Sequence, residues 1–274
     1  MDTNRAHWLA VARGGDVPPW QDVGAEPAGI VREDVDDPSG AWLRPREPMA
    51  DAAILAIHGG GFVSGSVDTH ARMFGHLARA TGVAVFAVEY GLVPEHVFPS
   101  QVETVERACA WLKARGARRI AVVGDSCGAL LAFALATRRR ADAPAALALF
   151  SAWTDLEARG ASYDLGRDPF FGRDLVRGLA AGYLAGVDPR DPQASPLFAD
   201  LGGLPPVLLQ AGGDEALRDD SLTLAARLSD AGVAVQVDLA PGELHTFQMA
   251  AGRSPAADAA IERTGAWLRS ILVS

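Results

Sequence analysis

Ser126 is the residue whose surroundings most clearly suggest chemistry. It lies in the run Gly124-Asp125-Ser126-Cys127-Gly128, between an apolar stretch and a stretch rich in alanine and leucine. A Gly-x-Ser-x-Gly turn that joins a strand to a helix holds the serine hydroxyl out at the carboxyl end of the strand. The following helix directs its first N–H groups at the same place. The pattern predicts that Ser126 is a nucleophile, although the pentapeptide alone also occurs in ordinary turns.

A second stretch, His58-Gly59-Gly60-Gly61-Phe62, follows an apolar run that begins near residue 53. Successive glycines let the backbone approach a ligand closely. We therefore expect the N–H groups of Gly60 and Gly61, together with that of Cys127, to bind a negatively charged oxygen, as in an oxyanion hole. A phosphate-binding loop is the alternative, but the stretch lacks both the Lys-Ser/Thr and the Gly-x-Gly-x-x-Gly patterns. His58 is predicted to be structural.

A serine hydroxyl needs a base that takes its proton before it becomes a good nucleophile. The chain has six histidines, and only His245, in the stretch PGELHTFQ, follows Ser126. In one known order of such sites, the nucleophile comes first, the acid second and the histidine last. The stretch follows an apolar run, so it forms a loop at the carboxyl end of a predicted strand. His245 is therefore predicted to be the base, although a lone loop histidine would be read as a surface residue.

The acid of such a site orients the histidine and stabilises its protonated form. Asp214 follows the apolar run 207–210 and two glycines, which places it in the next loop at the same edge of the sheet. Glu215, Asp219 and Asp220 are its rivals. These three lead into the next helix, where acidic residues also complement the helix dipole. Asp214 is the predicted acid.

Short apolar runs alternate with helical patterns along the chain. Most runs are continuous rather than alternating, which is typical of strands that are covered on both faces. Alternation of strands and helices predicts an α/β fold with a mostly parallel sheet and helices on both faces. The stretches 29–35 and 41–44 are expected to form an antiparallel edge. The other predicted strands are 53–57, 83–88, 120–123, 146–150, 207–210 and 233–237, and a helix over 257–271 is predicted to close the chain.

Two segments do not fit this alternation. Residues 1 to about 28 have no strand pattern and contain Trp8 and Trp20. Residues from about 155 to 200 separate two predicted sheet strands and contain Pro169-Phe170-Phe171 and a helical pattern near 175–184. A connection of this length inside a compact domain usually has a function, such as a lid.

The composition excludes several classes of protein. The chain has 274 residues, 49% of them hydrophobic, and a net charge of -9, which disfavours a nucleic-acid-binding surface. Its two cysteines, Cys109 and Cys127, make neither a disulfide framework nor, alone, a zinc site. We identify no signal peptide and no apolar run of the roughly 18 residues that a membrane span needs. The expectation is a soluble cytoplasmic protein that binds neither nucleic acid nor membrane.

From about residue 50 onward the chain resembles the hormone-sensitive-lipase family of α/β-hydrolases, the bacterial family IV carboxylesterases. The resemblance rests on the glycine-rich stretch, the elbow around Ser126, Asp214, His245, and the stretches VEYGLVPEHVFP (88–99) and SAWTDL (151–156). The chain departs from the family pattern where Cys127 replaces a small residue and where Ala129 replaces a glycine. Asp214-Glu215-Ala216-Leu217 replaces Asp-Pro-Leu and is more similar to lactone hydrolases and natural-product deacetylases.

The resemblance implies a single α/β-hydrolase domain with a small helical cap formed by residues 1–28 and 155–200. It also implies a serine hydrolase of short-chain or small carboxylic esters or lactones that needs no metal or cofactor. A natural-product tailoring enzyme is the alternative, and a non-catalytic small-molecule-binding protein is disfavoured because His245 is present. The substrate and the oligomeric state, a homodimer included, stay open. The expected pocket residues are Phe62, Trp153, Phe170 and Phe171, together with the N-terminal tryptophans.

Overall fold

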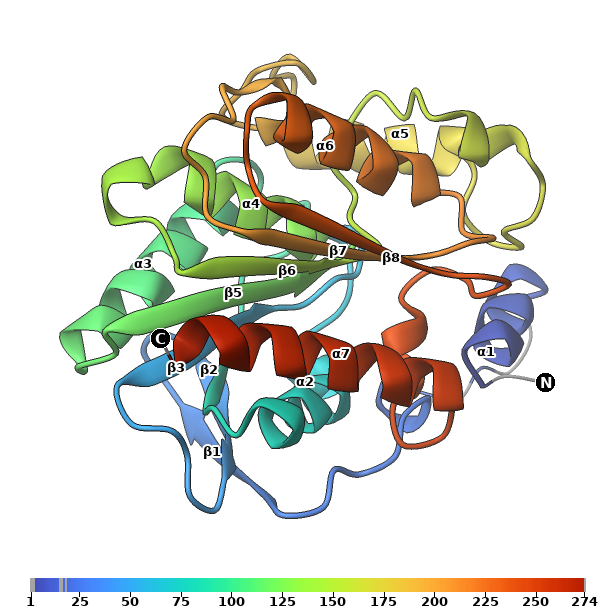
Figure 1. The fold of residues 1–274 in the computed structure, drawn as a ribbon. Coiled ribbons are helices and arrows are strands. Elements are labelled where there is room, and N and C mark those ends of the chain that lie inside the picture. The colour runs from blue at the N-terminus through green and yellow to red at the C-terminus, as the bar shows by residue number, and fades with distance from the viewer. Residues whose placement is uncertain (1–2, 15–16, 18, 274) are drawn as a thin grey trace.

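The computed structural model describes residues 3–14, 17 and 19–273, and over these residues the chain forms one α/β layer structure (Figure 1). Its centre is a sheet of eight strands in the order β1-β2-β4-β3-β5-β6-β7-β8. The first two strands pair antiparallel at one edge, and the strands from β4 to β8 are parallel. The strand bounds are β1 Ile30–Val35, β2 Gly40–Pro45, β3 Ala52–Ile57, β4 Val85–Val88, β5 Arg119–Asp125, β6 Ala146–Phe150, β7 Val207–Gly212 and β8 Val235–Ala240.

Helices cover both faces of the sheet, as the continuous apolar strands require. Helices α2 and α7 lie below the sheet in Figure 1, and α3, α4 and α6 lie above it. The helix bounds are α1 Thr3–Ala12, α2 Val67–Thr81, α3 Ser100–Ala114, α4 Cys127–Arg138, α5 Arg173–Leu184, α6 Arg218–Asp230 and α7 Pro255–Leu272.

The core consists of two apolar clusters, one on each face of the sheet. Successive residues of a strand point to opposite faces, so Leu55 and Val122 belong to the cluster under α3, α4 and α6. Their neighbours Ile54 and Ala121 belong to the cluster under α2 and α7. The strands are thus packed on both faces, and the loops described below follow their carboxyl ends.

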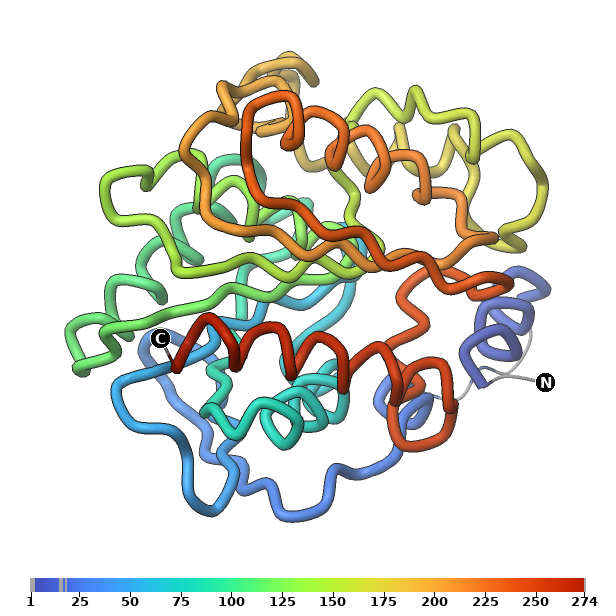
Figure 2. The backbone as a smooth tube through the Cα atoms, viewed as in Figure 1, coloured from blue at the N-terminus to red at the C-terminus, as the bar shows by residue number. Residues whose placement is uncertain are grey.

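The two segments that interrupt the predicted alternation meet at the end of the sheet where the parallel strands finish. Helix α1 lies beyond these strand ends, at the right in Figure 1. The connection between β6 and β7, drawn from yellow-green to orange, extends beyond the sheet before it returns to it (Figure 2). It contains α5 and the short turns Ala161–Asp164 and Pro196–Phe198. Residues 1, 2, 15, 16 and 18 of the predicted cap lie outside the described residues.

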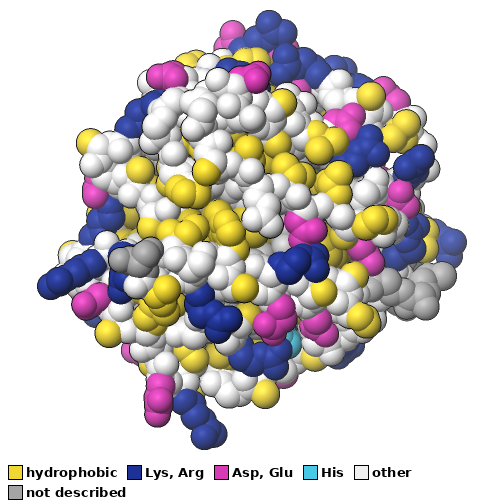
Figure 3. Space-filling view, viewed as in Figure 1, with side chains coloured by type: hydrophobic (Ala, Val, Ile, Leu, Met, Phe, Trp, Pro, Cys, Tyr) yellow, Lys and Arg dark blue, Asp and Glu magenta, His cyan; other side chains and the backbone are white. Residues whose placement is uncertain are grey.

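Basic and acidic side chains are interspersed over the face seen in Figure 3, and no single sign dominates it. Within the described part of the chain, no helix combines the length and the apolarity that crossing a membrane requires.

Candidate active site

The turn around Ser126 connects β5 directly to α4. Ser126 has φ 53° and ψ −122°, a backbone conformation that non-glycine residues rarely adopt and that marks functional sites. Its N–H donates to the carbonyl of Phe150 at 2.9 Å. A Cβ at Gly124 would lie 2.3 Å from the Gly128 oxygen, and one at Gly128 would lie 2.2 Å from the Ile57 oxygen. Both glycines are therefore required by close backbone contacts, and the strained serine between them projects its hydroxyl beyond the sheet.

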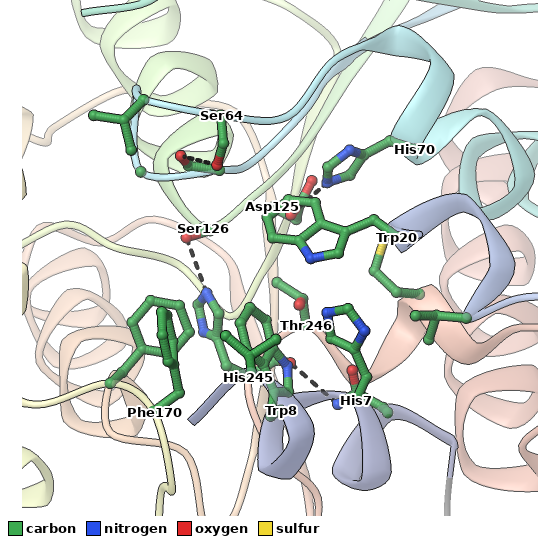
Figure 4. Close-up of a pocket in the computed structure, with 18 of the residues that line it drawn as sticks. His7, Trp8, Trp20, Ser64, His70, Asp125, Ser126, Phe170, His245 and Thr246 are labelled. Atoms are coloured by element: carbon green, nitrogen blue, oxygen red, sulfur yellow. Dashed lines mark hydrogen bonds and ion pairs between the residues drawn. The ribbon is translucent and has the colours of Figure 1, made fainter. Parts of the chain in front are cut away.

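His245 reaches this hydroxyl from the loop that follows β8. Its Nε2 lies 2.9 Å from the Ser126 Oγ (Figure 4), a normal hydrogen-bond distance. The histidine is 2% exposed. Its backbone oxygen accepts hydrogen bonds from Trp8 Nε1 at 2.8 Å and Asn4 Nδ2 at 3.1 Å, both on α1. The N-terminal helix therefore holds the loop that carries His245, a contact that nothing in the sequence suggested.

The carboxylate nearest to the other imidazole nitrogen belongs to Glu215, not to the expected Asp214. Glu215 Oε2 lies 3.8 Å from His245 Nδ1, and it accepts hydrogen bonds from Ser151 Oγ at 2.6 Å and from the Gly212 N–H at 3.1 Å. Neither His245 Nδ1 nor Glu215 Oε1 has a hydrogen-bond partner among the described residues. The two groups are therefore adjacent but not hydrogen-bonded.

Asp214 faces the other way, which corrects the prediction made for it. Its carboxylate pairs with Arg5 at 3.1 Å and with Arg167 at 3.5 Å, and its side chain is 28% exposed. The reason is local. After β7 ends at Gly212 the chain turns, so that consecutive side chains point in opposite directions, and it is Glu215 that points inward and is fully buried.

Burial shifts the pKa values of both interior groups toward their neutral forms. Burial lowers the pKa of His245 to about 4, opposed by the charges of Asp168 and Asp125. Burial also raises the pKa of Glu215 to about 8, opposed by the hydrogen bonds from Ser151 and Gly212. A neutral imidazole can accept the serine proton, and the ionised form of Glu215 would stabilise the imidazolium that results.

The glycine-rich stretch lies against the elbow and is fastened at several points. The Gly59 N–H donates to Asp125 Oδ1 at 3.0 Å, and the Tyr90 hydroxyl donates to the His58 oxygen at 2.8 Å. The His58 ring stacks on Tyr90 with 4.1 Å between centroids, and its Nε2 lies 3.2 Å from Glu89 Oε1. His58 thus holds the glycine-rich loop in place and does not reach Ser126.

Gly60 and Gly61 have φ values of 118° and 63°, and both line the same cavity as Ser126. The Cys127 side chain lies behind the loop, 3.5 Å from the Tyr90 hydroxyl. Burial raises the pKa of this thiol to about 11, so it stays protonated and acts as a small apolar group. Only its backbone N–H is suited to the site.

Asp125 connects the glycine loop to helix α2, a role that the sequence did not reveal. While Oδ1 binds Gly59, Oδ2 lies 3.3 Å from His70 Nε2. The other ring nitrogen of His70 lies 2.8 Å from Thr69 Oγ1. Asp125 belongs to the elbow motif, and its presence there was the only available signal of this role.

The site opens into an apolar cavity of about 200 Å³. Phe170 and Phe171 line it, as expected, and so do Trp8 and Trp20. Trp8 stacks on Phe170 with 5.3 Å between centroids, and Phe171 lies edge-on to His245 at 4.4 Å. Further lining residues are Val11, Val23, Val63, Leu175, Leu179 and Met249.

Phe62 and Trp153 do not line this cavity, which corrects the prediction for both. Phe62 is fully buried and stacks on Tyr183 of α5 with 3.9 Å between centroids. Trp153 is 2% exposed and lies 5.7 Å from Phe62. Phe62 therefore packs against α5, and Trp153 packs against Phe62 in the same core cluster.

No group of three or more His, Cys, Asp or Glu side chains within the described ranges is arranged to hold a metal ion.

Comparisons with known proteins agree with this geometry. A family model described as the alpha/beta hydrolase fold matches residues 54–249. The chain belongs to the α/β-hydrolase family. An acetyl-hydrolase of Streptomyces hygroscopicus is 36% identical over 256 residues, which cover 90% of this chain and 84% of the relative. An esterase of Acinetobacter venetianus is also 36% identical, over 76% of this chain and 73% of its own.

Solved structures place the chain more narrowly within the family. An esterase from the bacterial hormone-sensitive lipase family superposes with a TM-score of 0.91 at 34% identity, over 99% of this chain and 98% of its own. The esterase EstE5 superposes with a TM-score of 0.90 at 32% identity, over 99% of both chains. The resemblance to the hormone-sensitive-lipase family that the sequence motifs indicated is thereby confirmed.

Proposed function

We propose that this α/β-hydrolase is a serine carboxylesterase that cleaves small esters through an acyl-enzyme on Ser126. The observation that carries the proposal is the 2.9 Å hydrogen bond between the strained Ser126 hydroxyl and the buried His245 imidazole, facing a glycine loop in an apolar cavity. The comparisons support it, because the relatives of similar sequence and structure are named esterases and acetyl-hydrolases.

In the first step His245 Nε2 takes the Ser126 proton as Oγ attacks the ester carbonyl. The N–H groups of Gly60, Gly61 and Cys127 stabilise the oxyanion of the tetrahedral intermediate, a role for which donors must be in place before charge develops. Collapse of the intermediate returns the proton to the departing alcohol and leaves the acyl group on Ser126. Water, deprotonated by the same histidine, then releases the acid and regenerates the serine.

Glu215 takes the place of the acid in this scheme. Its buried carboxylate would accept the His245 Nδ1–H and stabilise the imidazolium formed in both steps. The support for this assignment is the 3.8 Å separation, the shared burial of the two groups and the absence of another partner for Nδ1 among the described side chains. Asp214 instead helps to attach Arg5 of α1 and Arg167 of the long connection to the sheet end.

The pocket favours small substrates. Its volume of about 200 Å³ is below the roughly 300–1,000 Å³ that is typical of pockets for drug-sized ligands. The segments 1–28 and 155–200 would act as the cap, because α1, Phe170, Phe171 and α5 supply most of the apolar lining. Relatives named for acetyl esters, such as an ethyl acetate hydrolase of Pseudomonas putida, support short acyl groups.

Purified protein incubated with p-nitrophenyl acetate and butyrate tests the proposal. We expect turnover that is lost in Ser126→Ala, and covalent labelling of Ser126 by a fluorophosphonate. Full activity of Ser126→Ala would refute the mechanism. Labelling without turnover of any ester would refute the esterase function and favour a specialised tailoring reaction on the same serine.

A further inference from the structure

His7 is a buried polar residue that the mechanism does not use. It lies on α1, is 5% exposed and lines the same cavity as Ser126. Neither Nδ1 nor Nε2 has a hydrogen-bond partner among the described residues. Figure 4 shows its ring extending from α1 into the pocket, on the side of Trp20 and Thr246.

The other two histidines of the pocket differ from His7. His70 uses both ring nitrogens, one toward Thr69 and one toward Asp125, and His245 bonds Ser126. Buried polar groups in folded proteins nearly always have partners, and each exception needs an explanation. A group that is unsatisfied only until a ligand enters is one such explanation, and the position of His7 on the cavity wall favours it.

The described neighbours of His7 do not supply a partner. The rings around it belong to Trp8 at 5.2 Å and Trp20 at 6.2 Å, both edge-on. The wall beyond them is formed by Val11, Val23 and Met249. His7 thus lies beside Thr246 in a part of the cavity wall that is otherwise mostly apolar. In such pockets a few polar groups determine orientation and specificity.

The chemistry of the ring defines the group that it would bind. Burial lowers the pKa of His7, so the ring is neutral and offers one donor and one acceptor. A neutral imidazole is poorly suited to recognise an anion. A hydroxyl group both donates and accepts, and it therefore satisfies either tautomer.

We propose that His7 is a specificity-determining residue that hydrogen-bonds a hydroxyl group of the substrate, so that the preferred substrates are small hydroxylated esters. This inference rests on the proposed esterase function and adds a substrate class to it. Plain alkyl esters enter the same pocket but leave His7 unsatisfied, and a site built to bond a hydroxyl discriminates against the analogue that lacks it.

Two pairs of esters of matched shape test the inference. In the acyl pair, p-nitrophenyl 3-hydroxybutyrate is compared with p-nitrophenyl 3-methylbutyrate. In the alcohol pair, 2-hydroxyethyl butyrate is compared with propyl butyrate. The readout is the ratio of kcat/KM for the hydroxyl and methyl members of each pair, in the wild type, His7→Phe and His7→Gln. Within a ratio, any general loss of folded enzyme cancels.

We expect the hydroxyl-to-methyl ratio of one pair to fall about tenfold in His7→Phe, the size of one hydrogen bond, mainly through a higher KM for the hydroxyl member. His7→Gln, which keeps a donor and an acceptor, should retain part of the preference. His96→Phe makes the same chemical change at an exposed residue outside the pocket and should leave both ratios at the wild-type value.

His7→Leu provides a second apolar variant if the phenyl ring destabilises α1. Unchanged ratios in both pairs for the apolar variants would overturn the inference while leaving the esterase function intact. An equal loss for both members of each pair would also overturn it, because that result assigns His7 a purely structural role. No turnover of any ester by the wild type would refute the esterase function, and this inference with it.

Discussion

Replacing Glu215 by glutamine is the sharpest test of how the site is organised. The change keeps the size of a fully buried side chain and removes its negative charge. The charge matters when His245 becomes an imidazolium during each step. At an effective dielectric constant of about 20, a unit charge attracts another across this separation with about 4 kcal/mol, and about 1.4 kcal/mol corresponds to a factor of ten in rate. We therefore expect kcat measured above pH 8, where Glu215 is ionised, to fall by about 10³-fold.

Asp214→Asn is the matched control, because the two acidic residues are adjacent in the chain but differ in surroundings. The Asp214 side chain is 28% exposed and binds two arginines that are 34% and 57% exposed. Ion pairs of this kind contribute about 0.2–1 kcal/mol to stability. The control should lose a little thermal stability and keep most of its turnover.

Steady-state kinetics with p-nitrophenyl butyrate, together with thermal unfolding of each variant, separate the possibilities. Active-site titration with a fluorophosphonate gives the fraction of folded enzyme. A large loss of kcat in Asp214→Asn with near-normal turnover in Glu215→Gln would refute the reasoning and restore the acid predicted from the sequence.

Three further predictions concern pH, the α1 contact and the elbow. Protonation of Glu215, whose pKa is raised to about 8, removes the charge that stabilises the imidazolium, so kcat/KM should rise with pH toward 8. The pH profile of Glu215→Gln should lack this rise. It should keep only the loss at low pH, where His245 with its pKa of about 4 is protonated. Trp8→Phe removes the hydrogen bond to the His245 oxygen and should lower kcat/KM by roughly 2- to 10-fold, measured with the same ester; no change would contradict the holding role of α1. Gly128→Ala places a Cβ 2.2 Å from the Ile57 oxygen and should lower the melting temperature and abolish turnover; a stable, active variant would contradict the packing of the elbow.

Most of the fold was predictable because its strands are buried on both faces and therefore appear as uninterrupted apolar runs. The predicted strand over 146–150 has the observed bounds of β6, whereas the run at 233–237 became Val235–Ala240. This last strand is at the edge of the sheet and is largely exposed or half-buried. Its apolar signal is weaker, so its bounds were the least predictable.

The contact between Ser126 and His245 was predictable for a different reason. Ser126 lies between two glycines, Gly124 and Gly128, at which any side chain would clash with the backbone. His245 is the only histidine that follows Ser126 in the sequence. For the acid, two adjacent residues that follow β7, Asp214 and Glu215, were both candidates. Which of them points inward depends on the path of a few backbone bonds after Gly212, and residue types do not encode that path.

Which side chains of the cap line the pocket was also only partly predictable from the sequence. Aromatic residues at Phe62 and Phe171 look alike in the sequence, yet one packs beneath α5 and the other faces His245. Helix α1 has no motif at all, but it bonds the His245 backbone through Trp8 and presents His7 to the cavity. Because one short helix both holds the loop of His245 and lines the pocket, we expect changes at Trp8 to affect turnover, whereas changes at His7 should affect only the choice of substrate. We therefore expect α1 to serve both substrate selection and the placement of His245, although Ser126, Glu215 and His245 all follow strands of the sheet.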